Sequence, residues 1–202
     1  MTIRVVLADA NELVPRTPRD YILCLAEIGL YDVRWSDAIW DEVARNLITK
    51  FGFSQQRIDY LSGRLEAELP HQHLVVPPEI EYLASLSGAD SKDEHVVAAA
   101  LAANADVLLT ENLRDFPQQW LHDRGIALLN LGALLVRTAE LFPEELLAAH
   151  NLVMASTRRT REDVLANLTR TIGDDSFTRL VELLPQAFEI DEKRPENPML
   201  GV

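Results

Sequence analysis

The sequence contains a single cysteine, Cys24, so no disulfide bond can form within the chain. Chains without a disulfide framework are typical of the reducing cytosol, and we therefore expect a cytoplasmic protein. No apolar run approaches the roughly 20 residues that a membrane-spanning helix needs. The first residues lead directly into a predicted strand rather than a signal peptide, so we expect no membrane association.

Positive charge is also scarce, with 19 Lys and Arg residues against 32 Asp and Glu, for a formal net charge of −13. This charge argues against non-specific binding of nucleic acid by the whole surface, although it permits a nucleic-acid enzyme whose acids bind divalent metal. The chain has no glycine-rich phosphate loop and no GxSxG nucleophile elbow. Arg158, Arg159 and Arg161 form its one dense basic cluster. Two interpretations of that cluster stay open: a solvated loop, or a patch that binds phosphate or a partner.

The stretch 90–117 carries the most information. Ser91 and Glu94 have the spacing of a capping box, which predicts a helix start, and an apolar stripe follows at helical spacing. Val107–Leu109 is a continuous apolar run, typical of a strand that is covered on both faces. Ligand groups in open α/β sheets gather beyond the carboxyl ends of strands. The polar residues at that position are Thr110, Glu111, Asn112 and Asp115.

The order of elements predicts the fold class. We expect strands over residues 3–8, 33–36, 74–78, 107–109 and 126–130, with helices over 17–28, 37–50, 51–70, 91–103 and 120–125. Helices alone follow residue 130, and residues 191–202 are predicted to be a loose tail. This alternation indicates an α/β fold with a mostly parallel sheet and helices on both faces, followed by a C-terminal helical extension. A chain of 202 residues is long enough for one domain with such an extension.

Four acids fall on the loops and helix starts of this arrangement. Asp9 follows the first strand, Glu42 lies on a helix, Asp93 is at a helix start and Asp115 follows a later strand. Each has an ordinary explanation by itself, such as a helix cap for Asp9 or a solvated pair with Arg45 for Glu42. Their joint placement favours a shared site. The segment from His71 to His73 is interpreted as a polar connector rather than a metal pair.

Three blocks of sequence resemble the acidic blocks of PIN-domain ribonucleases. They are VVLADAN, WSDAIWDEVARNL and DSKDEHVVAAALAANADVLLTENLRDFP. The similarity is closest to VapC-type toxins of bacterial toxin–antitoxin pairs and covers about residues 3–130. It implies a Rossmann-like sheet, a PIN-like nuclease domain over residues 1–135, and metal-dependent cleavage of RNA. Residues 136–202 would form a helical extension that the minimal domain lacks.

The resemblance also assigns roles to individual residues. Asp9, Glu42 and Asp93 match the first three acids of the family, and Thr110 matches the hydroxyl that steadies the first acid. The family has an Asp two residues after this Thr, where this chain has Asn112; Asp115 is the alternative carboxylate. All-oxygen ligation suits Mg²⁺ or Mn²⁺, and the number of ions stays open.

The expected metal ligands are Asp9 and Asp93, with Glu42 and Asp115 completing the set directly or through water. Asn11, Thr110 and Asn112 are expected to orient these ligands, and Arg45 and Arg114 are candidate contacts to RNA phosphate.

We therefore expect a Mg²⁺-dependent endoribonuclease, the toxin of a toxin–antitoxin pair, that cuts structured RNA such as transfer or ribosomal RNA. Its partner would be an antitoxin that covers the pocket. One alternative is a non-catalytic PIN-like module that binds RNA or protein, which Asn112 favours. A third hypothesis is a phosphotransfer protein with Asp9 as nucleophile. The C-terminal helices have three interpretations: docking on the sheet domain, pairing two subunits as a homodimer, or binding the antitoxin or RNA.

Overall fold

Five short strands form one parallel sheet in the computed structural model, which describes residues 3–70 and 72–188. The strands are β1 (Val5–Ala8), β2 (Asp32–Ser36), β3 (His73–Leu74), β4 (Val107–Leu109) and β5 (Ala127–Leu129). They pair in the order β3-β2-β1-β4-β5, and every pair is parallel. Each strand that the sequence predicts is present, although most are shorter than expected.

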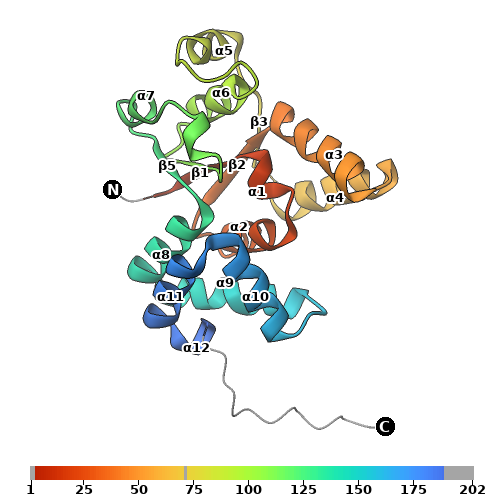
Figure 1. Cartoon of the computed structure of the whole chain (residues 1–202). Coiled ribbons are helices and arrows are strands. Elements are labelled where there is room, and N and C mark those ends of the chain that lie inside the picture. The colour runs from red at the N-terminus through yellow and green to blue at the C-terminus, as the bar shows by residue number, and fades with distance from the viewer. Residues whose placement is uncertain (1–2, 71, 189–202) are drawn as a thin grey trace.

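Helices cover both faces of this sheet. They are α1 (Ala10–Leu13), α2 (Arg16–Glu27), α3 (Asp37–Phe51), α4 (Gln55–Glu68), α5 (Pro78–Ser85), α6 (Glu94–Ala102), α7 (Gln118–His122), α8 (Leu131–Leu141), α9 (Pro143–Ser156), α10 (Arg161–Ile172), α11 (Asp174–Leu183) and α12 (Pro185–Phe188), with a 3₁₀ turn η1 (Leu113–Asp115). In Figure 1, α5 and α6 lie on one side of the sheet, and α2 lies on the other with α8–α12. The predicted α/β class is therefore confirmed. Among the described residues, every helix is too short or too polar to cross a membrane.

The strand order places a topological switch point between β1 and β4. The chain leaves β1 toward β2 and leaves β4 toward β5, so the winding direction reverses between these two central neighbours. Ligands bind outside the carboxyl ends of strands at such a switch point. Asp9 and Thr110 are the residues that follow β1 and β4 there, and Leu7 and Leu108, paired just before them, are fully buried.

The C-terminal helices pack against α2. The Tyr21 hydroxyl on α2 is hydrogen-bonded to Nδ1 of His150 on α9 at 2.7 Å, and the Phe188 ring meets the His150 ring edge-on at 4.9 Å. Burial lowers the pKa of His150 to about 4, so its imidazole is neutral in this interface at physiological pH. A second buried hydrogen bond joins Tyr31 to Thr138 of α8 at 2.8 Å. These contacts correspond to the first of the three interpretations, docking on the sheet domain. The predicted tail 191–202 lies outside the described residues.

Two predicted helix starts are wrong. Helix α6 begins at Glu94 with Asp93 as its N-cap, and not at a Ser91 capping box. The side chain of Asp90 instead accepts the backbone N–H of Lys92, a local bond that competes with capping by serine. Helix α2 begins at Arg16 rather than after Thr17. Pro18 is tolerated inside its first turn because the N–H that proline lacks would have no intrahelical acceptor there.

Two short helices were not expected from the sequence. Helix α1 starts directly after β1, because the Asp9 side chain accepts the Ala10 N–H and so caps it. Helix α5 starts at Pro78, where the sequence suggested only the end of a strand; proline suits the first helical position. Ser36 and Thr160 cap α3 and α10, since their hydroxyls accept the N–H groups of Ile39 and Asp163.

Two helical glycines should respond in opposite ways to alanine. A Cβ on Gly132 in α8 would lie 2.7 Å from Ser176 Oγ and 3.1 Å from the Ile172 carbonyl, whereas a Cβ on Gly63 in α4 would meet nothing within 4 Å. We expect Gly132→Ala to destabilise the protein by about 1–3 kcal/mol through overpacking. Gly63→Ala should stabilise it by about 0.5–1 kcal/mol through helix propensity. Urea unfolding measures both, and equal effects would contradict this packing of α8.

Candidate active site

Asp9 lies at the switch point, and both of its carboxylate oxygens accept hydrogen bonds. Its side chain is 6% exposed. Oδ1 accepts the Ala10 N–H at 2.6 Å, and Oδ2 accepts the hydroxyl of Thr110 at 2.8 Å. Since a hydroxyl has one hydrogen to donate, the Thr110 oxygen is otherwise an acceptor. It accepts Nδ2 of Asn11 at 2.9 Å and the backbone N–H of Asn112 at 3.1 Å.

This network holds Asp9 in one orientation. The expected orienting residues Asn11 and Thr110 are both in it through their side chains. Asn112 takes part through its backbone N–H. Asn11 also ties the two strand ends together, because its Oδ1 accepts the Glu111 N–H at 3.3 Å. The carboxyl of Asp9 is thus fixed between β1 and β4 by groups from both.

Burial raises the pKa of Asp9 to about 6. The hydrogen bonds from Thr110 and Ala10 oppose this rise, the charge of Glu42 adds to it, and the charge of His95 opposes it. His95 is the one positive charge among the causes of this shift. A divalent ion bound at Asp9 would reverse the shift, because an opposite charge favours the ionised form.

Glu42 and His95 lie beside Asp9. Glu42 is on α3 and His95 is on α6, and Nε2 of His95 is 3.5 Å from Oε2 of Glu42. His95 was not anticipated from the sequence. Its only sequence signal is its place two residues after Asp93, near the start of the same helix.

Asp93 and Asp115 form a second pair that Lys92 bridges. The Lys92 ammonium is 3.5 Å from Oδ2 of Asp93 and 3.4 Å from Oδ2 of Asp115. Burial raises the pKa of Asp93, the charge of Lys92 opposes this rise, and the charge of Asp115 adds to it. Apart from this ammonium, Oδ2 of Asp93 is buried without a hydrogen-bond partner. The Lys92 side chain is 63% exposed, so it can move away at little cost.

The four predicted acids therefore form two pairs that adjoin at the start of α6. Asp9 interacts with Glu42, and Asp93 interacts with Asp115. Across residues 3–70 and 72–188, no three His, Cys, Asp or Glu side chains are already arranged as a metal cage. The donor set nevertheless fits a hard divalent cation, because it offers carboxylate oxygens, one of them buried and unpartnered at Asp93.

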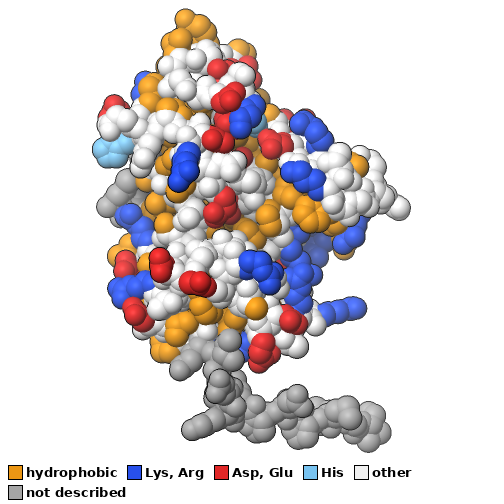
Figure 2. Space-filling model, in the orientation of Figure 1, with side chains coloured by type: hydrophobic (Ala, Val, Ile, Leu, Met, Phe, Trp, Pro, Cys, Tyr) orange, Lys and Arg blue, Asp and Glu red, His pale blue; other side chains and the backbone are white. Residues whose placement is uncertain are grey.

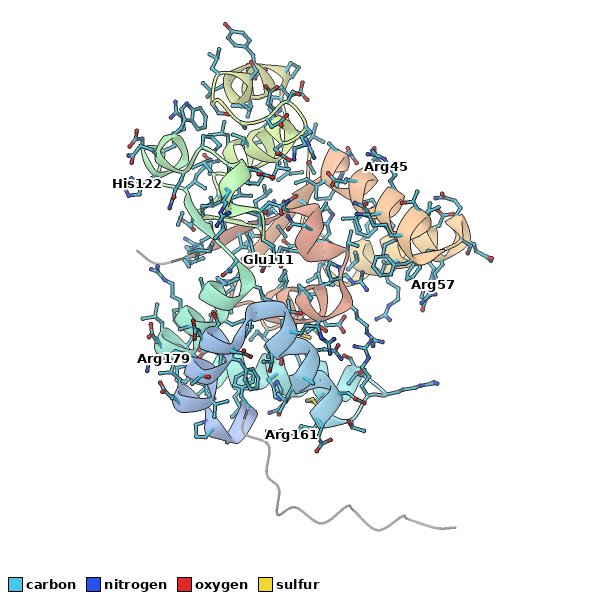
Figure 3. All side chains as sticks on the ribbon, in the orientation of Figure 1. Arg45, Arg57, Glu111, His122, Arg161 and Arg179 are labelled. Atoms are coloured by element: carbon cyan, nitrogen blue, oxygen red, sulfur yellow. The ribbon has the colours of Figure 1, made fainter. Side chains whose placement is uncertain are left out.

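A buried glutamate, Glu12, beside the exposed Glu111 adjoins the site and was also missed. Glu12 on α1 is fully buried, and it faces Glu111 after β4 and the start of α8 at Leu131. Burial raises the pKa of Glu12 to about 8, and the charges of Glu111 and Asp9 add to this rise. Figure 3 shows Glu111 between the sheet and α8. Glu12 lies three residues after Asp9, about one helical turn. The two side chains come to the same side only because these residues form α1, a helix that the sequence did not predict.

The two arginines expected to contact phosphate are exposed. Arg45 projects from the surface of α3 in Figure 3, and Arg114 lies in η1 beside Asp115. Nε2 of His73, part of the predicted polar connector, lies 2.7 Å from Oδ1 of Asp37. His71 lies outside the described residues.

A model of the PIN domain family matches residues 5–114 of this chain. The match runs from β1 into η1 and contains Asp9, Glu42 and Asp93, whereas Asp115 follows its last residue. Comparisons with curated proteins and with solved structures give no significant match.

Proposed function

The chain belongs to the PIN domain family, whose members are generally nucleases, and from this we propose that it is a Mg²⁺-dependent endoribonuclease. The observation that carries the proposal is the buried carboxyl of Asp9 at the switch point, which Thr110 orients and whose pKa is raised by burial and by the charge of Glu42. Such a carboxyl is costly to keep ionised unless the site binds positive charge.

In this proposal the ligands of Mg²⁺ or Mn²⁺ come from both acid pairs: Asp9, Glu42, Asp93 and Asp115. When bound, the cation acidifies water for attack on a phosphodiester and offsets the charge of the phosphate. Thr110 holds Asp9 in place through its hydrogen bond, which keeps that carboxylate oriented without help from solvent. Lys92 balances the charges of Asp93 and Asp115, and its exposed side chain would turn into water where a cation was held by these two acids.

We further propose that the protein is the toxin of a toxin–antitoxin pair that acts in the cytoplasm on transfer or ribosomal RNA. Support comes from the sequence blocks around Asp9, Glu42 and Asp93, which resemble those of VapC-type toxins. We also propose that the nuclease domain ends near residue 135 and that the helical extension begins there. Growth arrest on expression of the chain, relieved by a co-expressed neighbouring gene product, would support it.

A second candidate function is a non-catalytic PIN-like module that binds RNA or protein. It is favoured by Asn112 in place of the family's fourth acid, and by the absence of a ready cage of three ligands in the described part of the chain. This candidate requires that no divalent ion bind with carboxylate-dependent affinity. Calorimetric titration with Mn²⁺ therefore separates it from the nuclease.

Incubating the purified protein with RNA tests the proposed function. We expect cleavage in Mg²⁺ and none in excess EDTA, with Asp93→Asn inactive in both. Cleavage that continues in EDTA, or that is unchanged in Asp93→Asn, would contradict a metal bound by these acids.

A further inference from the structure

A groove of about 800 Å³ lies between α2, the α3–α4 hairpin and the segment from the end of α9 to α10. It is separate from the acid pairs and was not apparent from the sequence. Six arginines are among the residues that line it: Arg16, Arg19, Arg57, Arg64, Arg159 and Arg170. In Figure 2, blue side chains gather between the hairpin and the C-terminal helices.

The groove is lined mainly by positive charge, whereas the protein as a whole is negatively charged. Its lining contains two acids, Asp20 and Glu27, against the six arginines, in a chain with a net charge of −13. The like charges are close enough to interact: after burial, which is the largest cause, Arg16 and Arg57 lower the pKa of Arg19, while Asp20 opposes them. Repulsion of this kind is reduced when an anion binds, so the groove is a local site for negative charge.

Several of these guanidinium groups are presented to solvent. Arg57, Arg159 and Arg170 are exposed. Arg57 lies over the Phe53 ring at 3.8 Å, and Arg170 donates to Asn167, so neither contact neutralises charge. Arginine binds phosphate oxygens through two parallel N–H groups and also stacks on planar rings, which lysine does not.

Aromatic side chains line the same groove. Tyr60 is 68% exposed and Phe51 is 59% exposed, large fractions for such residues. Proteins that bind single-stranded nucleic acid combine a positive groove for the backbone with exposed rings on which bases stack. An acidic polypeptide would use the charge of the groove but has no flat bases for these rings. The composition of the groove therefore favours RNA over an acidic protein segment.

Two elements connect the groove to the acids. Asp9 is the N-cap of helix α1, and at the other end of this helix the carbonyls of Leu13 and Val14 accept Nη1 of Arg19, which lines the groove. Helix α3 carries Glu42 beside Asp9 and Phe51 in the groove. A single strand of RNA that extends from the acids along α1 and α3 would enter the groove directly.

We propose that this groove binds the sugar–phosphate backbone of single-stranded RNA that extends away from the cleavage site. The inference rests on the proposed function, because it assigns the path of the same substrate. It gives the C-terminal helices a part in RNA binding, since Arg159 and Arg170 come from α10 and the loop before it. The enzyme would then hold RNA against the repulsion of its acidic surface.

The test compares two triple variants of equal charge. One is Arg57→Gln, Arg159→Gln and Arg170→Gln in the groove; the control is Arg4→Gln, Arg124→Gln and Arg179→Gln, all three exposed and outside it. Anisotropy of a fluorescein-labelled single-stranded oligoribonucleotide is measured over a salt series in EDTA, which prevents metal-dependent cleavage. Circular dichroism checks that both variants are folded.

We expect the groove variant to bind about 100-fold more weakly than wild type at 0.1 M salt, with the slope of log K against log salt smaller by about 2. The control should stay within about threefold of wild type, because charges distant from the RNA are screened. Placing Lys instead of Gln at the three groove positions, which restores the positive charge, should recover most of the wild-type slope of log K against log salt. Equal binding of RNA by the two triple variants would overturn the proposal. Binding of labelled polyglutamate that depends on the groove arginines, without any binding of RNA, would also overturn it.

Failure of the groove and failure of the nuclease give different results. If RNA is cleaved in Mg²⁺ and both triple variants bind RNA equally, the nuclease function is supported and RNA binding by the groove is excluded. Groove-dependent binding in EDTA without any cleavage in Mg²⁺ leaves the groove and removes the nuclease.

Discussion

Asp9→Asn is expected to abolish Mg²⁺-dependent RNA cleavage without making the protein less stable at neutral pH. Asparagine keeps the size of the side chain and one oxygen for the Thr110 hydroxyl, but it gives up the second oxygen, which accepts the Ala10 N–H, and it loses the negative charge that would bind the cation. Removing one stabilising group from an active site typically costs about 10²–10³-fold in rate, and a ligand of the metal should cost at least that.

The stability part of this expectation follows from the pKa of Asp9. Its folded value, about 6, is above the ordinary value of 3.8, so ionising this carboxyl costs stability as the pH rises through that window. At neutral pH the neutral amide therefore removes a cost. Cleavage assays and thermal unfolding of the same samples measure both effects, with Asp123→Asn, directly after α7, as an exposed control. A stable Asp9→Asn protein that cleaves RNA at the wild-type rate would exclude Asp9 from the metal site.

Glu12→Gln is expected to stabilise the protein strongly in alkaline solution and hardly at all in acid. The folded pKa of Glu12, about 8, lies above its ordinary value of 4.5, so the stability contributed by the neutral carboxyl is present below pH 4.5 and lost as the pH rises toward 8. Glutamine cannot ionise and avoids this loss. We expect a gain on the order of 3 kcal/mol near pH 8 and less than about 1 kcal/mol near pH 4.

Urea unfolding at the two pH values measures this difference, with Glu66→Gln on the exposed surface of α4 as the matched control. The control should show the same small effect at both pH values. A Glu12→Gln protein that is less stable than wild type near pH 8 would contradict the burial of a repelled carboxyl beside Glu111.

The sheet could be predicted from the sequence because its strands are continuous apolar runs between helical patterns. Val107–Leu109 and Ile3–Ala8 carry that signal in their own residues, and the structure buries the strands as expected. The start of α6 could not be predicted, because Ser91 and Asp90 compete for the same turn and the sequence does not state which wins. Short helices such as α1 have too few residues for a periodic pattern.

The candidate site was predictable only in part, for a related reason. Asp9, Glu42 and Asp93 lie in blocks that resemble the family, and the family match includes all three, but their role as ligands stays a prediction. His95 and Glu12 were missed because their importance arises from neighbours that are distant in the sequence: Glu42 on another helix, and Glu111 after another strand.

A crystal structure of the protein grown with Mn²⁺ shows whether the two acid pairs share one cation site. We expect anomalous density for manganese within ligand distance, about 2.0–2.2 Å, of carboxylate oxygens from both Asp9 and Asp93, with the Lys92 ammonium moved away. Manganese bound only elsewhere, with Lys92 still between Asp93 and Asp115, would exclude a shared cation site.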